Sequence, residues 1–167
     1  MSQPARSMWE GNPSDEEREA VLRKLVRPYF VRECRSVLDP YLFKAGFRSS
    51  RSGPDLVEFR RGRCLLQFSY MPHVTDEQPR YALTVGIGDY RGWFRRPRVI
   101  GFWQVPNPDC GGKRWSWEFR GPEQLKRALN QVVRLLDEYA KPLWEDEQQL
   151  HAVLDKEWPI YLELANP

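Results

Sequence analysis

The sequence has few of the residues that build metal centres and covalent active sites. It contains three cysteines, Cys34, Cys64 and Cys110, and two histidines, His73 and His151. The odd number and wide spacing of the cysteines argue against a disulfide framework, and no Cys-x-x-Cys pair is present. Neither histidine has a second histidine or a cysteine one helical turn away. We therefore expect no metal site and no cofactor.

Targeting and membrane signals are also missing from the sequence. No positively charged segment followed by an apolar run opens the chain, as a signal peptide would. No apolar run approaches the roughly 18 residues of a membrane-spanning helix. These absences predict a cytoplasmic protein with reduced thiols and no membrane partner.

The recognised catalytic motifs are absent or incomplete. There is no Gly-x-Ser-x-Gly elbow. Residues Gly86–Gly92 resemble a dinucleotide-binding loop, but the last glycine comes one residue late and no helix pattern follows. Asp55 and Glu58 lie too close in sequence to converge on two metals from separate elements. The sequence thus favours a binding protein over an enzyme, although an active site built from distant residues stays open.

The sequence is rich in aromatic residues and uneven in charge. Aromatic residues make up 13% of the 167 residues, which predicts a folded core rather than a disordered chain. Residues 1–47 carry 8 basic and 7 acidic groups, residues 48–120 carry 13 and 7, and residues 121–167 carry 5 and 9. The segment charges of +1, +6 and −4 sum to +3. The basic middle either binds a polyanion or attracts the acidic C-terminal part of the same domain.

The N-terminal third carries a helical pattern. Ser14 and Glu17 form a capping box, and apolar residues then recur at steps of three and four up to Phe47. Pro28 kinks or stops this helix, and Asp39-Pro40 either kinks it or caps a second one. Gly46 suits the left-handed residue after a helix end. Residues 1–13 form a flexible lead in which only Trp9 has reason to dock.

The middle of the chain alternates at the period of strands. We expect a polar loop at Arg48–Asp55 and a hairpin that turns at Arg61-Gly62. Period-two alternation predicts the strands Leu56–Phe59, Cys64–Tyr70, Tyr81–Ile87 and Arg114–Phe119, and Val99–Val105 could be a further strand. The last two could pair with each other as a hairpin.

The C-terminal part returns to a helical pattern. A helix is expected from Gly121-Pro122 to Pro142, which ends or kinks it, and a second from about Leu143 to Leu154. An apolar tail including Trp158 then docks on the core. Helices, then strands, then helices predict an α+β fold, with an antiparallel sheet of about five strands and N- and C-terminal helices packed on it. Residues 14–167 form a single α+β domain.

Four short motifs carry a family resemblance. They are Tyr-Leu-Phe-Lys-Ala-Gly-Phe at 41–47, Val-Glu-Phe-Arg-Arg at 57–61, Leu-Leu-Gln-Phe-Ser at 65–69 and Tyr-Ala-Leu-Thr-Val-Gly-Ile at 81–87. Over about residues 30–90 the chain resembles the bacterial family filed as domain of unknown function 4304. That family has a Leu-Lys-x-x-Gly-Phe helix exit, a hairpin and a strand that ends in Gly-Ile. The resemblance implies an α+β cytoplasmic domain, and it implies no activity and no catalytic residue.

Two charged segments are the candidate partner-binding surfaces. The first interleaves arginines with aromatics, namely Arg91, Trp93, Phe94, Arg95, Arg96 and Arg98. This mixture is typical of protein hot spots and also of nucleic-acid contacts that combine charge with base stacking. Alternatively, the two aromatics cover the sheet while the arginines stay solvated. The second segment, Glu145, Asp146 and Glu147, is either a solvated helix start or a surface for a basic partner.

These observations lead to two functional hypotheses. The first is a small protein-binding domain, such as an immunity or antitoxin-like protein that associates stoichiometrically with a toxin and does no catalysis. The alternative is a nucleic-acid-binding module that uses segment 91–98. The sequence leaves the oligomeric state open.

Overall fold

The computed structural model describes residues 8–9, 11–92, 95–101 and 117–165, with side chains up to Lys156. In chain order, its elements are α1 (Asp15–Lys44), β1 (Arg48–Gly53), β2 (Leu56–Arg61), β3 (Cys64–Pro72), β4 (Tyr81–Asp89), β5 (Arg98–Gly101), β6 (Trp117–Phe119), α2 (Pro122–Leu135), the π-helical segment η3 (Leu136–Ala140), α3 (Lys141–Glu145) and α4 (Glu147–Ala165).

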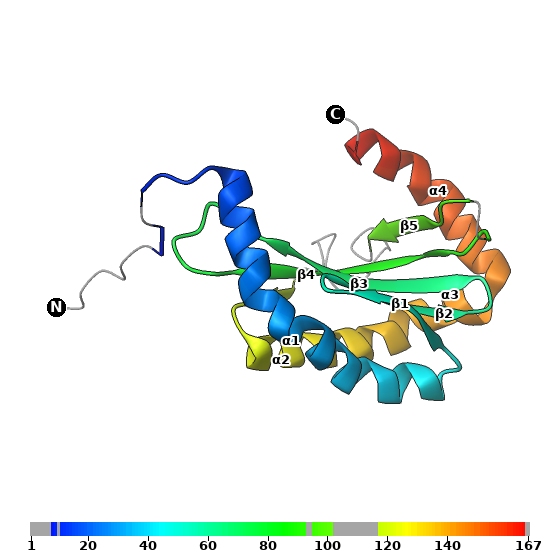
Figure 1. The fold of residues 1–167 in the computed structure, drawn as a ribbon. Coiled ribbons are helices and arrows are strands. Elements are labelled where there is room, and N and C mark those ends of the chain that lie inside the picture. The colour runs from blue at the N-terminus through cyan, green and yellow to red at the C-terminus, as the bar shows by residue number, and fades with distance from the viewer. Residues whose placement is uncertain (1–7, 10, 93–94, 102–116, 166–167) are drawn as a thin grey trace.

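Helix α1 is one continuous helix that contains both prolines. It begins at the predicted capping box, in which the Ser14 amide donates to Glu17 Oε2 at 2.8 Å and the Glu17 amide donates to Ser14 Oγ at 3.3 Å. Pro28 and Pro40 lie inside it, so neither of them ends the helix. Figure 1 shows the curved course of α1 beneath the sheet. Gly46, with φ of 89°, takes the predicted left-handed conformation directly after the helix.

The described strands form one antiparallel sheet, which confirms the predicted α+β class. The order is β1-β2-β3-β4-β5, and β6 also pairs with β4. Strand β4 pairs with β3 along its whole length, while β6 pairs with its first part, Tyr81–Leu83, and β5 pairs with its last part, Gly86–Asp89. Where they are described, the last two strands thus pair with β4 and not with each other, and the rest of the predicted hairpin stays a prediction. The residues that join them lie outside the described part of the chain.

The loop predicted at Arg48–Asp55 is also wrong in most of its length. Arg48–Gly53 forms the edge strand β1, which pairs with β2 through the main chain and has a register irregularity between Ser49 and Arg51. Almost all of its side chains are exposed, so no apolar alternation revealed it. From α1, Arg35 donates hydrogen bonds to Ser49 Oγ and Ser52 Oγ, which fixes the strand against the helix.

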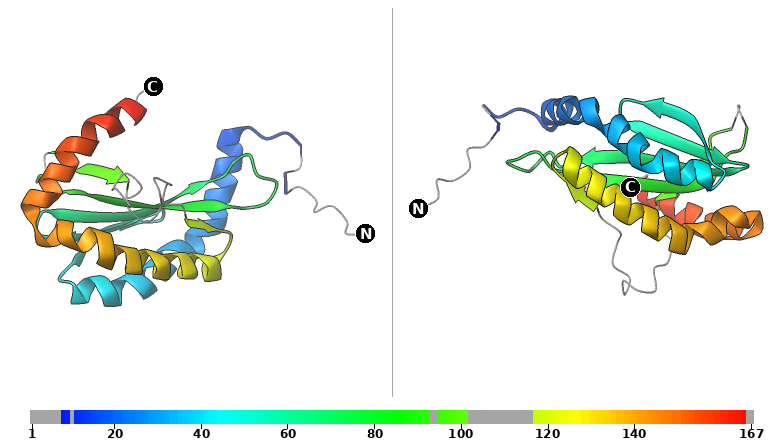
Figure 2. Two further views of the ribbon diagram at one scale, coloured as in Figure 1. Left: turned by 180° about the vertical axis from the view of Figure 1, so that it is seen from behind. Right: turned by 90° about the horizontal axis from the view of Figure 1, so that it is seen from below.

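Helices α1 and α2 cover one face of the sheet, as both Figure 1 and Figure 2 show. The core lies between these helices and the sheet and includes Phe30, Phe59, Phe68, Tyr81 and Phe119, all nearly or fully buried. Cys34 and Cys64 are buried free thiols. Helix α4 contacts β4 and β5 and rises past the β5 end of the sheet.

The opposite face of β2, β3 and β4 carries small and polar side chains such as Glu58, Gln67, Ser69 and Thr84. Because side chains alternate across a strand, these residues point away from α1 and α2. We call this side of the sheet the open face. None of the helices in the described residues is long and apolar enough to cross a membrane.

The ends of the chain agree with prediction in one detail and depart from it in another. Trp9 docks as expected, since its indole Nε1 donates to the Asp76 carbonyl at 2.9 Å. The second C-terminal helix starts later and runs further than predicted, because Asp146 breaks the helix and α4 then continues to Ala165. The predicted docking of Trp158 lies outside the side chains that the structure describes.

Candidate functional site

Asp89 is a buried carboxylate at the end of β4. Its exposed fraction is 0%, and it is the one buried charged residue among those the structure describes. Asp89 lies on the same face of β4 as Ile87, which faces the helices. A buried carboxylate is costly unless it is paired and hydrogen-bonded. The surroundings of Asp89 must therefore supply compensating charge.

Arg98 supplies most of that compensation. Its Nη2 donates to Asp89 Oδ2 at 3.1 Å and its Nε donates to Asp89 Oδ1 at 3.4 Å. These two bonds form a bidentate ion pair between β5 and β4. Its Nη1 donates to Asp155 of α4 at 2.6 Å. The hydrogen bonds that Arg98 donates to Asp89 and Asp155 raise the pKa of Arg98, although burial opposes the rise. One guanidinium thus joins β4, β5 and α4.

Nitrogen atoms of three further side chains surround the same carboxylate. Asp89 Oδ2 lies 3.7 Å from Arg91 Nε, 3.9 Å from Arg63 Nη2 and 3.7 Å from His151 Nε2. Arg63 Nε in turn lies 3.3 Å from a carboxylate oxygen of Glu147. We call this set the Asp89 cluster; it comprises Asp89, Arg63, Arg91, Arg98, Glu147, His151 and Asp155. It brings together residues from both segments that the sequence singled out.

The residues predicted at 91–98 have different environments. Arg98 is 13% exposed and bonded on two sides, so it is a structural residue in this conformation. Arg91 is exposed and lies at the edge of the Asp89 cluster. Arg95 and Arg96 are exposed. Trp93 and Phe94 lie outside the described residues.

The acidic run also divides into separate roles. Asp146 caps α4, because its Oδ1 accepts the amides of Gln148 and Gln149 at 2.9 and 3.3 Å. Glu147 belongs to the Asp89 cluster, and Glu145 is exposed and lines a pocket beside α1. The three neighbours therefore do not form a single acidic patch.

A groove on the open face gathers arginines from three parts of the chain. We call it the arginine groove; its volume is about 480 Å³ and it is lined by Ser50, Arg51, Glu58, Arg60, Leu65, Tyr90, Gly92, Arg95 and Pro97. Arg51 comes from β1, Arg60 from β2 and Arg95 from the predicted segment. All three arginines are exposed. Within the described residues, no carboxylate forms an ion pair with any of them.

The charged and aromatic groups of the groove are held in place by neighbours. Glu58 accepts hydrogen bonds from Ser50 Oγ at 2.7 Å and from Gln67 Nε2 at 2.8 Å. The guanidinium of Arg60 lies 3.8 Å from the centre of the Tyr90 ring. Glu58 is the only acidic residue among the described residues of the lining, and its carboxylate is already hydrogen-bonded. The three exposed arginines lie beside it.

Sequence reasoning missed most of this geometry. Period-two alternation from Tyr81 to Ile87 continues to Asp89, so a charge on the apolar face of a strand was the available signal. No comparable signal marks the groove, because the polar sequence of β1 shows no apolar alternation and predicts a loop. Within the described part of the chain, no group of three or more His, Cys, Asp or Glu side chains could hold a metal ion.

Comparison with known proteins adds no functional information. No family model, curated protein or solved structure matches this chain. The resemblance to the family of unknown function therefore stays a prediction. Only the geometry of the Asp89 cluster and of the arginine groove bears on function.

Proposed function

We propose that this protein acts by stoichiometric association and that the arginine groove contacts an acidic surface of a protein partner. The observation that carries the proposal is the convergence of Arg51, Arg60 and Arg95 on one groove of the open face. Complementary charge accelerates association and suppresses unsuitable partners. The groove is lined by residues of the open face. Figure 2 shows that α1 and α2 lie on the opposite side of the sheet.

The composition of the open face favours a protein partner over nucleic acid. Protein interfaces are enriched in Arg, Met and aromatic residues and depleted in Lys. The described groove lining contains three arginines and no lysine, and Met71, on the same face of the sheet, is 61% exposed. Single-stranded nucleic acid instead needs aromatic rings on which bases stack. One face of the Tyr90 ring is already covered by Arg60.

An immunity or antitoxin-like role is one specific form of this proposal. Such a protein neutralises a toxin by occupying a surface that the toxin needs, which requires complementary charge and a rigid scaffold. The Asp89 cluster fixes the end of the sheet next to the groove, so the contact surface would change little on binding.

The test uses two variants with the same change in charge. Arg51→Gln/Arg95→Gln removes two charges from the groove, and Lys24→Gln/Lys126→Gln removes two exposed charges from α1 and α2. Each protein is used as bait in a native pull-down from the source cell, with mass spectrometry and an absorbance check for nucleic acid. We expect one stoichiometric protein with the wild type and the control, and a strong loss with the groove variant.

Two other outcomes would contradict the proposal. Equal capture by the groove variant and the control would exclude the groove as the contact surface. Nucleic acid that co-purifies with the wild type and is released by salt would favour the nucleic-acid alternative, since phosphate contacts weaken steeply with salt.

A further inference from the structure

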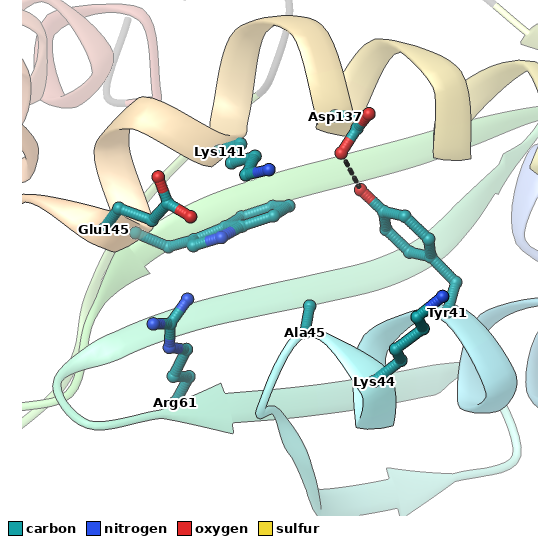
Figure 3. Close-up of a pocket in the computed structure, with 8 residues that line it drawn as sticks. Tyr41, Lys44, Ala45, Arg61, Asp137, Lys141 and Glu145 are labelled. Carbon is teal, nitrogen blue, oxygen red and sulfur yellow. Dashed lines mark hydrogen bonds between the residues drawn. The ribbon is translucent and has the colours of Figure 1, made fainter.

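A second pocket lies between the end of α1 and the helical segment that follows α2. Its volume is about 500 Å³, within the usual range of about 300–1,000 Å³ for small-molecule sites. Figure 3 shows Tyr41, Lys44 and Ala45 at the end of α1, Asp137, Lys141 and Glu145 on the facing helical segment, and Arg61 from β2. Trp144 completes the lining. We call it the Trp144 pocket.

The walls of the Trp144 pocket combine apolar surface with uncompensated positive charge. Trp144 is 8% exposed and packs edge-on against Phe47, with ring centres 5.2 Å apart, so its position is fixed. Lys44 and Lys141 are exposed at the rim. Among the described residues, no carboxylate lies within ion-pair distance of Lys44, Arg61 or Lys141.

One of the two carboxylates in the lining is already bonded. The Tyr41 hydroxyl donates to Asp137 Oδ1 at 3.3 Å, as the dashed line in Figure 3 marks. Burial raises the pKa of Tyr41, and the negative charge of the nearby Asp137 raises it further. The hydroxyl therefore keeps its proton at neutral pH. The lining therefore holds three cations against Glu145 and the bonded Asp137.

The backbone of the helical wall is unusual. Leu136–Ala140 is π-helical, and the Lys141 amide donates to the Leu136 carbonyl five residues back. Such segments are rare and occur frequently at functional sites. Asp137 lies in this π-helical turn, and Lys141 and Trp144 follow it in α3. All three line the pocket, so the irregular turn belongs to its wall.

We propose that the Trp144 pocket binds a small organic anion with a flat apolar body. The body would pack beside Trp144 and Ala45, and its carboxylate or phosphate group would contact Lys44, Arg61 and Lys141. This inference is independent of the groove and of any protein partner, because the two sites share no lining residue.

The experiment is an NMR titration of the full chain with benzoate, phenyl phosphate and the neutral isostere benzamide. The indole N–H signal of Trp144 is assigned as the one missing from the spectrum of the Trp144→Phe variant. Saturable shifts of that signal are expected for at least one of the two anions, with Kd below about 1 mM. Benzamide should bind at least about tenfold more weakly. The difference between benzoate and phenyl phosphate identifies the preferred head group.

Variants then locate the charge that binds. Lys44→Gln/Lys141→Gln should weaken anion binding about fivefold or more, whereas Lys24→Gln/Lys126→Gln should leave it unchanged. Dispersed spectra establish that both variants are folded. The inference is overturned by equal binding of anions and benzamide, by equal loss in both variants, or by no saturable shift up to about 10 mM.

Discussion

Neutralising Asp89 should destabilise the fold more than neutralising Asp155, although both carboxylates bind the same guanidinium. Asp89 is fully buried and bonded to Arg98 at 3.1 Å, whereas Asp155 is 69% exposed and bonded to it at 2.6 Å. Two unit charges about 3 Å apart attract by about 5 kcal/mol at an effective dielectric constant of about 20. Desolvation of both groups and the remaining hydrogen bond of an asparagine reduce this figure. We expect Asp89→Asn to lower the free energy of unfolding by about 2–3 kcal/mol.

The assay is urea denaturation followed by circular dichroism, with thermal unfolding as a second measure. For a chain of this size, a loss of 2–3 kcal/mol lowers Tm by about 4–12 °C. Asp155→Asn should give a much smaller shift, because water screens and replaces the exposed pair. Equal shifts in the two variants would refute the account of Asp89 as the buried centre of the cluster. A changed denaturant slope would show instead that the variant altered the folded or unfolded ensemble.

Three further predictions use other parts of the fold. Gly88→Ala should destabilise by about 2 kcal/mol or more in urea denaturation, because a Cβ would meet the Arg98 carbonyl oxygen at 1.9 Å, while Gly53→Ala, with open space around it, should change stability by less than about 0.5 kcal/mol. Hydrogen bonding from Arg27 holds the pKa of Asp55 in the folded protein below its ordinary value of 3.8. The ionised Asp55 side chain therefore stabilises the fold fully above the ordinary pKa, and this stabilisation is lost as the pH falls through the lowered pKa of the folded state. The stability difference between wild type and Asp55→Asn should therefore be constant above about pH 5 and shrink below about pH 4, and a difference that stays constant down to pH 2 would contradict the pairing. In a Cys110→Ser background, the buried Cys34 and Cys64 should react with a thiol reagent only after unfolding, since burial raises the pKa of both, that of Cys64 to about 12; fast reaction of the native protein would show that the core opens locally.

The sequence was informative wherever a local pattern determines structure. The capping box at Ser14, the left-handed Gly46 and the alternation of Tyr81–Ile87 each depend on neighbouring residues, and each is present in the structure. Strand β1 was missed because its exposed side chains contain no apolar alternation and its pairing depends on the main chain. The division of β4 between β5 and β6 is a long-range choice that no local pattern determines.

The candidate site was predictable only in part, for the same reason. Arg95 and Glu145 were singled out from local composition and do line the groove and the Trp144 pocket, respectively. Their neighbours Arg51, Arg60 and Lys44 come from elements distant in sequence, and only the tertiary fold brings them together. Arg98 shows the opposite case. Local composition predicts an exposed contact residue there, but in the structure the side chain is paired with the buried carboxylate of Asp89.

The central claim is that the arginine groove recognises an acidic protein partner. Its most direct test is the association rate of the captured partner with the wild type, Arg51→Gln/Arg95→Gln and Lys24→Gln/Lys126→Gln, measured at two or more salt concentrations. The account predicts that the groove variant associates at least about fivefold more slowly and with a weaker salt dependence, because steering charge is lost. Equal rates and equal salt dependence for the three proteins would contradict it.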